Sequence, residues 1–166
     1  MDNNFLLMLL IAVVVCGFAA WLIFMQKKTK ATEQKESREA NLLKLQAYER
    51  LTLLVDRIAL PNIISRKNTP GISAREMQLL LTGNIKEEFN YNITQQIYVS
   101  AEAWTAVKNL KEQNILVVNQ IANVLPPDAT GLDLCKFLLE FLMNDRKGTL
   151  HEVVSEVLSF EAKKLM

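Results

Sequence analysis

One uninterrupted apolar segment, FLLMLLIAVVVCGFAAWLIFM from Phe5 to Met25, constrains the fold of this chain more than any other feature. It holds 21 residues without a charged side chain. At about 1.5 Å of rise per residue, a helix of that length extends about 31 Å, and the hydrocarbon core of a bilayer is about 30 Å thick. The segment therefore predicts a single transmembrane helix in contact with the lipid bilayer.

The residues that flank this segment predict its orientation. A cleaved signal peptide would carry basic residues before a shorter apolar core, whereas this chain begins Met-Asp-Asn-Asn. Lys27, Lys28 and Lys30 follow the segment instead, and basic residues favour the cytoplasmic side. We therefore expect an uncleaved anchor in the inner (cytoplasmic) membrane, with the N-terminus outside and the C-terminal domain in the cytoplasm.

Beyond the anchor, the spacing of apolar residues predicts helices and no sheet. Residues 26–60 are interpreted as a charged juxtamembrane stem helix whose later part carries one apolar face. That face comprises Leu43, Ala47, Leu51, Leu54 and Ile58. Pro61 is expected to push Leu60 out of the helical region, so that residues 61–71 form a connection.

Capping motifs divide residues 72–166 into a bundle of about four helices. Ser73 and Glu76 have the spacing of a capping box, the same box recurs from Thr149 to Glu152, and Thr130-Gly131-Leu132-Asp133 is a weaker version. The helices are expected near residues 74–97, 101–125, 131–146 and 150–165. The predicted fold class is thus all-α, with one transmembrane helix, a stem helix and a cytoplasmic helical domain over residues 72–166 that folds without the anchor.

Part of this region resembles a known family. The run EEFNYNITQQIYVSAEAWTAVKNLKEQ, followed by Pro126-Pro127 and Gly131-Leu132-Asp133-Leu134, is similar to an uncharacterised family of bacterial proteins with one N-terminal membrane helix and a small helical cytoplasmic region. The likeness covers most of the chain. It implies the location and the fold. It implies no activity, because no function or site residue is known for that family.

The residue inventory argues against catalysis. The chain has one histidine, His151, and two cysteines, Cys16 and Cys135, so Ser-His-Asp, Cys-His and multi-histidine metal arrangements lack parts. The five glycines form no phosphate-binding loop. We therefore expect no catalytic residue, no metal and no cofactor, with Cys135 as a thiol of the core and His151 exposed in the first turn of the last helix.

Nucleic acid is excluded as a partner by the charge pattern. Basic and acidic residues almost balance beyond residue 30, and the basic doublets have acidic neighbours in the sequence. Nucleic-acid binding needs a concentrated basic face.

The stretch EEFNYNITQQIYVSAEAW, from Glu87 to Trp104, is the one place where polar and aromatic residues gather. We interpret it as a helix end, a tight corner and a helix start at Ser100, with Trp104 directed into the core. A binding site is the alternative, because several polar side chains there could face inward. Those candidate binding residues are Asn92, Gln95, Gln96 and Tyr98.

Two function classes follow from these observations. The first is a membrane-anchored, non-catalytic interaction or scaffold protein that faces the cytoplasm and binds a protein partner. The alternative is an enzyme or small-ligand receptor with a pocket between helices near Asn92, Gln96, Tyr98 and Trp104. A pocket rich in those side chains would favour the alternative, and an apolar groove would favour the first class.

A homo-oligomer is a further hypothesis. Ala12, Cys16 and Ala20 recur every four residues in the apolar segment and would let two helices approach closely. The apolar face of the stem resembles a broken heptad seam. Asn114 interrupts the apolar face of its helix, where it could set the register between two copies or form a hydrogen bond within one chain.

Overall fold

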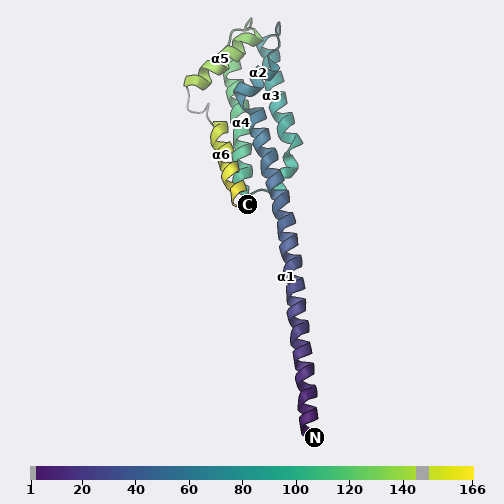
Figure 1. The fold of residues 1–166 in the computed structure, drawn as a ribbon. Coiled ribbons are helices and arrows are strands. Elements are labelled where there is room, and N and C mark those ends of the chain that lie inside the picture. The colour runs from purple at the N-terminus through teal and green to yellow at the C-terminus, as the bar shows by residue number, and fades with distance from the viewer. Residues whose placement is uncertain (1–2, 145–149) are drawn as a thin grey trace. The chain divides into compact units, whose positions relative to one another are not determined.

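The computed structural model describes residues 3–144 and 150–166, and these residues form helices and no strand (Figure 1). The elements are α1 (Asn3–Ile58), α2 (Leu60–Lys67), α3 (Ala74–Tyr91), the 3-10 helix η1 (Ile93–Ile97), α4 (Ala101–Val124), α5 (Gly131–Asn144) and α6 (Leu150–Lys163). The predicted all-α fold class is confirmed.

Most side chains of the predicted transmembrane segment, Phe5–Met25, lie outside the part of the chain that the structure describes. Among the described residues, no helix has a stretch both long enough and apolar enough to cross a membrane. The side chains of residues 5–17 are outside the described part, and so is the small-residue stripe of Ala12, Cys16 and Ala20. The transmembrane helix and the contact through that stripe therefore remain predictions.

The chain divides into two compact units, Met1–Leu42 and Leu43–Met166. The second unit, called here the C-terminal unit, begins within the stem rather than at residue 72, where the sequence placed the start of the domain. The physical reason is burial, because Ala47, Leu51, Leu54 and Ile58 are each at most 1% exposed. From Ala47 on, the predicted apolar face of the stem is thus part of the core of the unit itself, whereas Leu43, its first member, is exposed.

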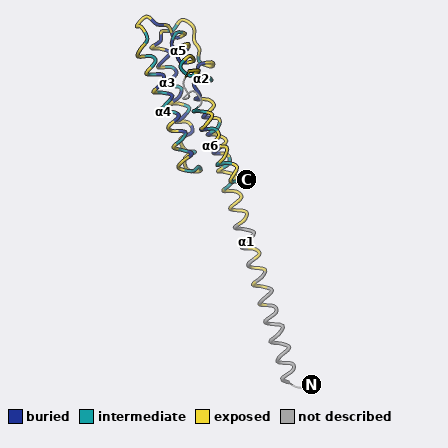
Figure 2. The backbone as a smooth tube through the Cα atoms, turned by 90° about the vertical axis from the view of Figure 1, so that its left-hand side faces the viewer, coloured by how far each residue is buried: buried dark blue, intermediate teal, exposed yellow. Residues whose placement is uncertain are grey.

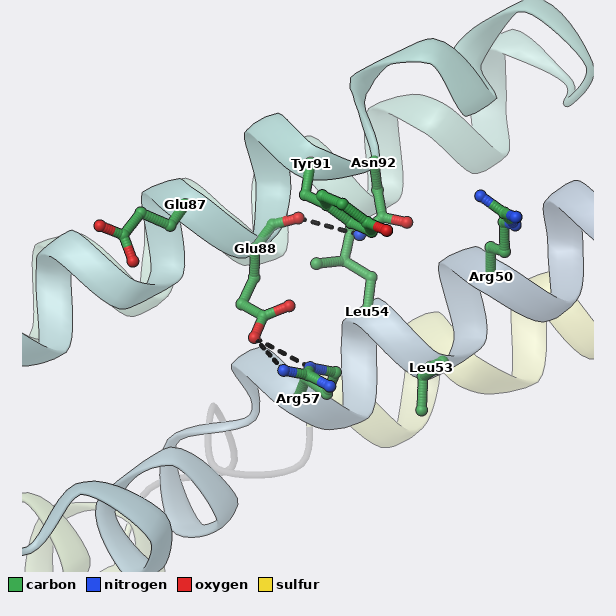
Figure 3. Close-up of a pocket in the computed structure, with 8 residues that line it drawn as sticks. All are labelled: Arg50, Leu53, Leu54, Arg57, Glu87, Glu88, Tyr91 and Asn92. Atoms are coloured by element: carbon green, nitrogen blue, oxygen red, sulfur yellow. Dashed lines mark hydrogen bonds and ion pairs between the residues drawn. The ribbon is translucent and has the colours of Figure 1, made fainter.

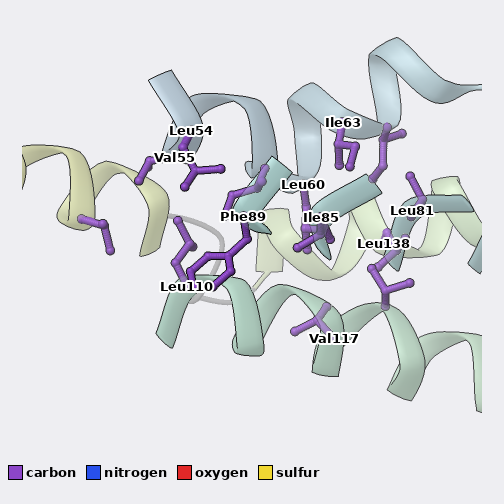
Figure 4. Close-up of a cluster of buried hydrophobic side chains, with 14 of the residues drawn as sticks. Leu54, Val55, Leu60, Ile63, Leu81, Ile85, Phe89, Leu110, Val117 and Leu138 are labelled. Carbon is purple, nitrogen blue, oxygen red and sulfur yellow. The ribbon is translucent and has the colours of Figure 1, made fainter. Parts of the chain in front are cut away.

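The core of the C-terminal unit lies between α3, α4, α5, α6 and the last turns of α1. Figure 2 shows buried positions recurring along these helices. In Figure 4, Leu54 of α1 and Leu110 of α4 lie close to Phe89, and Leu81 of α3 lies near Leu138 of α5. Packing of several amphipathic helices around shared apolar side chains is what stabilises short helices that are marginal alone.

The break between α1 and α2 differs from the predicted connection. Ala59, with φ −54° and ψ 125°, is the extended residue, while Leu60 is already helical and Pro61 lies in the first turn of α2. Proline is favoured in a first turn because its missing N–H would have no helical partner there. Residues 61–67 of the predicted connection are therefore helical, with Ile63 and Ile64 buried against the core, while residues 68–71 form the connection to α3.

Three side chains donate hydrogen bonds to the last carbonyl groups of α1, at this break. Asn62 Nδ2 donates to the Asp56 carbonyl at 3.0 Å, and the Arg66 guanidinium donates to the Arg57 carbonyl. Asn114 Nδ2, on α4, donates to the Ile58 carbonyl at 2.7 Å. The last carbonyls of a helix need such partners. The end of α1 is therefore attached to α2 and α4 by hydrogen bonds.

The predicted capping boxes at Ser73 and Thr130 are confirmed, and they lie side by side. Ser73 and Glu76 exchange hydrogen bonds at the start of α3, as Thr130 and Asp133 do before α5. The backbone N–H of Gly131 donates to the Ile72 carbonyl at 2.8 Å. A Cβ at this glycine would lie 3.2 Å from that oxygen, so glycine permits the close approach. The predicted box at Thr149 lies outside the described residues.

The predicted helix over residues 74–97 ends earlier, at Tyr91. Asn92 leaves the helical conformation with φ −101° and ψ 8°, and its side chain donates to the Glu88 carbonyl at 2.9 Å. Residues 93–97 continue as the 3-10 helix η1. Asparagine is common at such ends because its amide competes for nearby backbone groups.

Candidate functional site

The stretch from Glu87 to Trp104 is a corner between α3 and α4, as interpreted from the sequence. The Ser100 hydroxyl accepts a hydrogen bond from the Ala103 N–H at 3.2 Å and so caps α4. The Ser100 N–H donates to the Tyr48 hydroxyl of α1 at 3.1 Å. The corner is thus held by the Ser100 cap expected from the sequence and by a hydrogen bond to α1 that the sequence spacing does not reveal.

The four candidate binding residues, all within residues 92–98, differ in burial and in the hydrogen bonds that they form. Asn92 is buried and its amide is used to cap α3. Gln95 is half-buried and donates to the Thr94 hydroxyl at 3.4 Å, while Gln96 and Tyr98 are exposed. Trp104, expected in the core, is half-buried with its ring centroid 5.1 Å from that of Phe89.

Asn92 does line a pocket, and its other walls come from residues that the sequence did not indicate. This pocket, the α1–α3 groove, encloses about 530 Å³ within the C-terminal unit (Figure 3). Its lining residues are Arg50, Leu53, Leu54, Arg57, Glu87, Glu88, Tyr91 and Asn92.

An ion pair crosses the floor of the groove. Arg57 Nε donates to Glu88 Oε1 at 2.9 Å, as the dashed lines in Figure 3 mark. The hydrogen bond with Glu88, reinforced by the carboxylate charge, raises the pKa of Arg57 above its ordinary value. Glu88 is the less exposed partner, with 16% of its side chain accessible against 45% for Arg57. The pair joins two helices through residues 31 positions apart.

The two walls of the groove carry charges of opposite sign. Arg50 and Arg57 lie on the α1 wall, and Glu87 and Glu88 lie on the α3 wall. Within the described residues, neither Arg50 nor Glu87 has an ion-pair partner. Figure 3 shows these two at opposite ends of the groove.

Two large side chains of the groove are exposed. Leu53 is 57% exposed and Tyr91 is 81% exposed. Both lie between the terminal charges in Figure 3. An exposed leucine and tyrosine flanked by charges resemble the apolar centre and polar rim of a protein-binding surface more than a closed pocket.

A second pocket, of about 690 Å³, lies between the α2–α3 and α4–α5 connections over residues 68–73 and 127–132. The polar groups at its two helix starts are already used. A backbone hydrogen bond from Ser73 lowers the pKa of Glu76, and a side-chain hydrogen bond from Thr130 lowers that of Asp133. These carboxylates occupy the positions that an external anion would need.

Cys135 and His151, the residues considered for catalysis, lie on different helices. Cys135 is buried in α5, as expected, and burial raises the pKa of its thiol. His151 lies in the first turn of α6 and is half-buried rather than exposed. Across residues 3–144 and 150–166, no three His, Cys, Asp or Glu side chains gather where they could hold a metal ion.

The groove had a weak signal in the sequence. Arg50, Leu53 and Arg57 are spaced by three and four residues and so share a second face of the stem helix. The opposing face of α3 could not be matched to it without the tertiary structure.

Comparison with known proteins gives one match. Residues 3–165 match the model of the Family of unknown function (DUF7935), in line with the expected likeness to an uncharacterised family. No curated protein and no solved structure matches the chain.

Proposed function

The chain belongs to the Family of unknown function (DUF7935), and since that description assigns no activity, we propose a function from the residues themselves. The protein is a bacterial, single-pass inner-membrane protein without catalytic activity. Its C-terminal unit faces the cytoplasm and binds a protein partner through the α1–α3 groove.

The anchor in this proposal rests on the segment from Phe5 to Met25. Its 21 residues include no charge, and Lys27, Lys28 and Lys30 follow directly. Apolar length supports insertion, and the basic flank supports a cytoplasmic C-terminus.

The groove is the observation that carries the binding function. Leu53 and Tyr91 expose large side chains to water. Covering such surface by a partner lowers the free energy, and this favours binding. Arg50 and Glu87, at the two ends, supply charges that can select the partner and its orientation.

The enzyme or small-ligand alternative has less support. Of Asn92, Gln96, Tyr98 and Trp104, Asn92 is the member that lines the α1–α3 groove. Small-molecule sites commonly bury about 70 to 90% of their ligand. With Leu53 and Tyr91 so open to solvent, a small ligand in the groove would stay largely exposed.

A site-specific cross-linking experiment tests the binding function. A photoreactive amino acid is introduced at Tyr91 in the full chain, in intact membranes, and at Val124 as a control. Both positions are 81% exposed, so they sample solvent equally. We expect a protein adduct from position 91 and none from position 124. Equal adducts from both positions, or none from position 91, would refute the groove as the binding surface.

The topology is tested separately with alkaline phosphatase fused after Met166. The enzyme should be inactive, because it would remain in the cytoplasm. An active fusion would overturn the proposed orientation and leave the cross-linking result unaffected.

A further inference from the structure

We infer that the α1–α3 groove binds the same groove of a second copy of this chain, so that the α1 wall of each copy lies on the α3 wall of the other. This inference rests on the proposed function and names its partner. It follows from the charges, the exposed side chains and the symmetry that two identical surfaces must obey.

Two copies that meet through the same surface are related by a twofold axis lying in the interface. If the axis runs along the helices, the α1 wall of one copy faces the α3 wall of the other. Arg57 and Glu88, which lie at the same level of the groove, then face Glu88 and Arg57 of the other copy, whereas Arg50 and Glu87, at opposite ends, do not meet. If the axis runs across the helices at that level, α1 faces α1 in the opposite direction, and Arg57 opposes Arg57 of the second copy as Glu88 opposes Glu88. Like charges in direct opposition are unfavourable, so the charges select the first arrangement.

The selected arrangement places the two copies parallel. In such a pair, α1 and α3 of one copy run in the same direction as α1 and α3 of the other.

The exposed side chains occupy the centre of this interface. Leu53 on the α1 wall and Tyr91 on the α3 wall both lie between the levels of Arg50 and Glu87 along the groove (Figure 3). In a parallel pair, Leu53 of each copy therefore meets Tyr91 of the other. Tyrosine and arginine are enriched among the residues that contribute most to binding, and both are present here.

The features of the C-terminal unit that the sequence connected with self-association serve the fold of one chain instead. Leu51, Leu54 and Ile58 of the predicted seam are buried in the core. The Asn114 amide donates to the Ile58 carbonyl of its own chain. A contact between copies must use another surface, and the groove lies on the neighbouring face of the same helix.

A charge-swapped variant tests the inference. It combines Arg50→Glu, Arg57→Glu, Glu87→Arg and Glu88→Arg, so the pair across the groove floor is kept with its signs reversed. Full-length chains with two different tags are co-expressed and captured from membranes through one tag. Wild type should capture wild type, and the swapped variant should capture itself. Capture between wild type and the swapped variant should fall about tenfold or more, because like-charged walls would then face each other.

The matched control is Lys136→Glu with Glu140→Lys, which swaps an exposed ion pair of α5 outside the groove. This variant should capture wild type as well as wild type captures itself. Equal capture of the groove-swapped variant by wild type, or failure of wild type to capture itself, would overturn the inference.

Disulfide cross-linking keeps the inference testable if the swapped variant does not fold. With both native cysteines changed to alanine, one tagged copy carries Leu53→Cys and the other carries Tyr91→Cys. Oxidation should join the two tags covalently, and Val124→Cys in place of Tyr91→Cys should not. If no such dimer forms while position 91 still cross-links to a different protein, this inference fails and the proposed function stands. If position 91 gives no adduct at all, both fail.

Discussion

Replacing Asn114 by alanine is expected to destabilise the C-terminal unit, because this side chain caps the end of α1 from a different helix. Asn114 is 7% exposed and Ile58 is fully buried. The amide nitrogen lies 2.7 Å from the Ile58 carbonyl oxygen. Pro61 has no N–H to offer, and the helix break at Ala59 removes the regular pattern of donors. Without the amide, the carbonyl stays buried and loses this donor.

The magnitude follows from the cost of such a group. A buried backbone acceptor left without a partner costs about 1 to 3 kcal/mol. Unfolding entropy is about 2.1 cal/mol/K per residue, which gives about 0.26 kcal/mol/K for the 124 residues from Leu43 to Met166. The midpoint of thermal unfolding should therefore fall by about 4 to 12 °C.

The assay is thermal unfolding of a fragment over residues 43–166, followed by far-ultraviolet circular dichroism. Asn109→Ala is the control, because Asn109 is exposed on the same helix and undergoes the same gain in helix propensity. The free energy of unfolding of the Asn109→Ala variant should fall by less than about 0.5 kcal/mol. If the two variants melt at the same temperature, the Ile58 carbonyl does not depend on Asn114 and our account of the α1 end is wrong.

Three further predictions concern the same unit. A fragment of residues 43–166 should melt cooperatively. The shorter fragment 72–166, which the sequence predicts to fold alone, should not melt cooperatively, because it lacks the buried face of α1. A cooperative melt of the shorter fragment in circular dichroism would contradict this. Gly131→Ala should destabilise the unit by about 1 to 3 kcal/mol, because the added Cβ would lie 3.0 Å from a side-chain carbon of Ile72. Gly83→Ala should stabilise α3 by about 0.5 to 1 kcal/mol, because a Cβ there would meet nothing within 4 Å. Chemical denaturation measures both changes in the free energy of unfolding. The folded-state pKa of Asp133 is lowered from 3.8, so its contribution to stability is present above that pH and is lost as the pH falls through the folded value; Asp133→Asn should therefore flatten the loss of stability between pH 4 and pH 2 in thermal melts.

Local patterns in the sequence were sufficient for the helical class and for several boundaries. The capping boxes at Ser73 and Thr130 were predictable because a box involves residues three positions apart, and its hydrogen bonds form within one helical turn. The corner before Ser100 was predictable for the same reason. The helix at Leu60–Lys67 was missed, because proline signals a break without saying whether a new helix begins at once.

Residues far apart in the chain depended on the tertiary structure. Arg57 and Glu88 are separated by 31 positions and Asn114 and Ile58 by 56, so no periodic pattern relates them. The predicted binding residues Gln95, Gln96 and Tyr98 were chosen for polarity, but the groove forms where α1 and α3 place opposite charges side by side.

By itself, the sequence determined the helical class and most of the helix starts, because helix formation and capping depend on spacing along the chain. The tertiary structure decided which face of each helix was left for a partner. The apolar face of the stem, considered from the sequence as a seam between two copies, is part of the core of the C-terminal unit, where burying Leu51, Leu54 and Ile58 removes their apolar surface from water. The face that carries Arg50 and Leu53 remained exposed because burying the charge of Arg50 in the core without a partner would cost too much free energy.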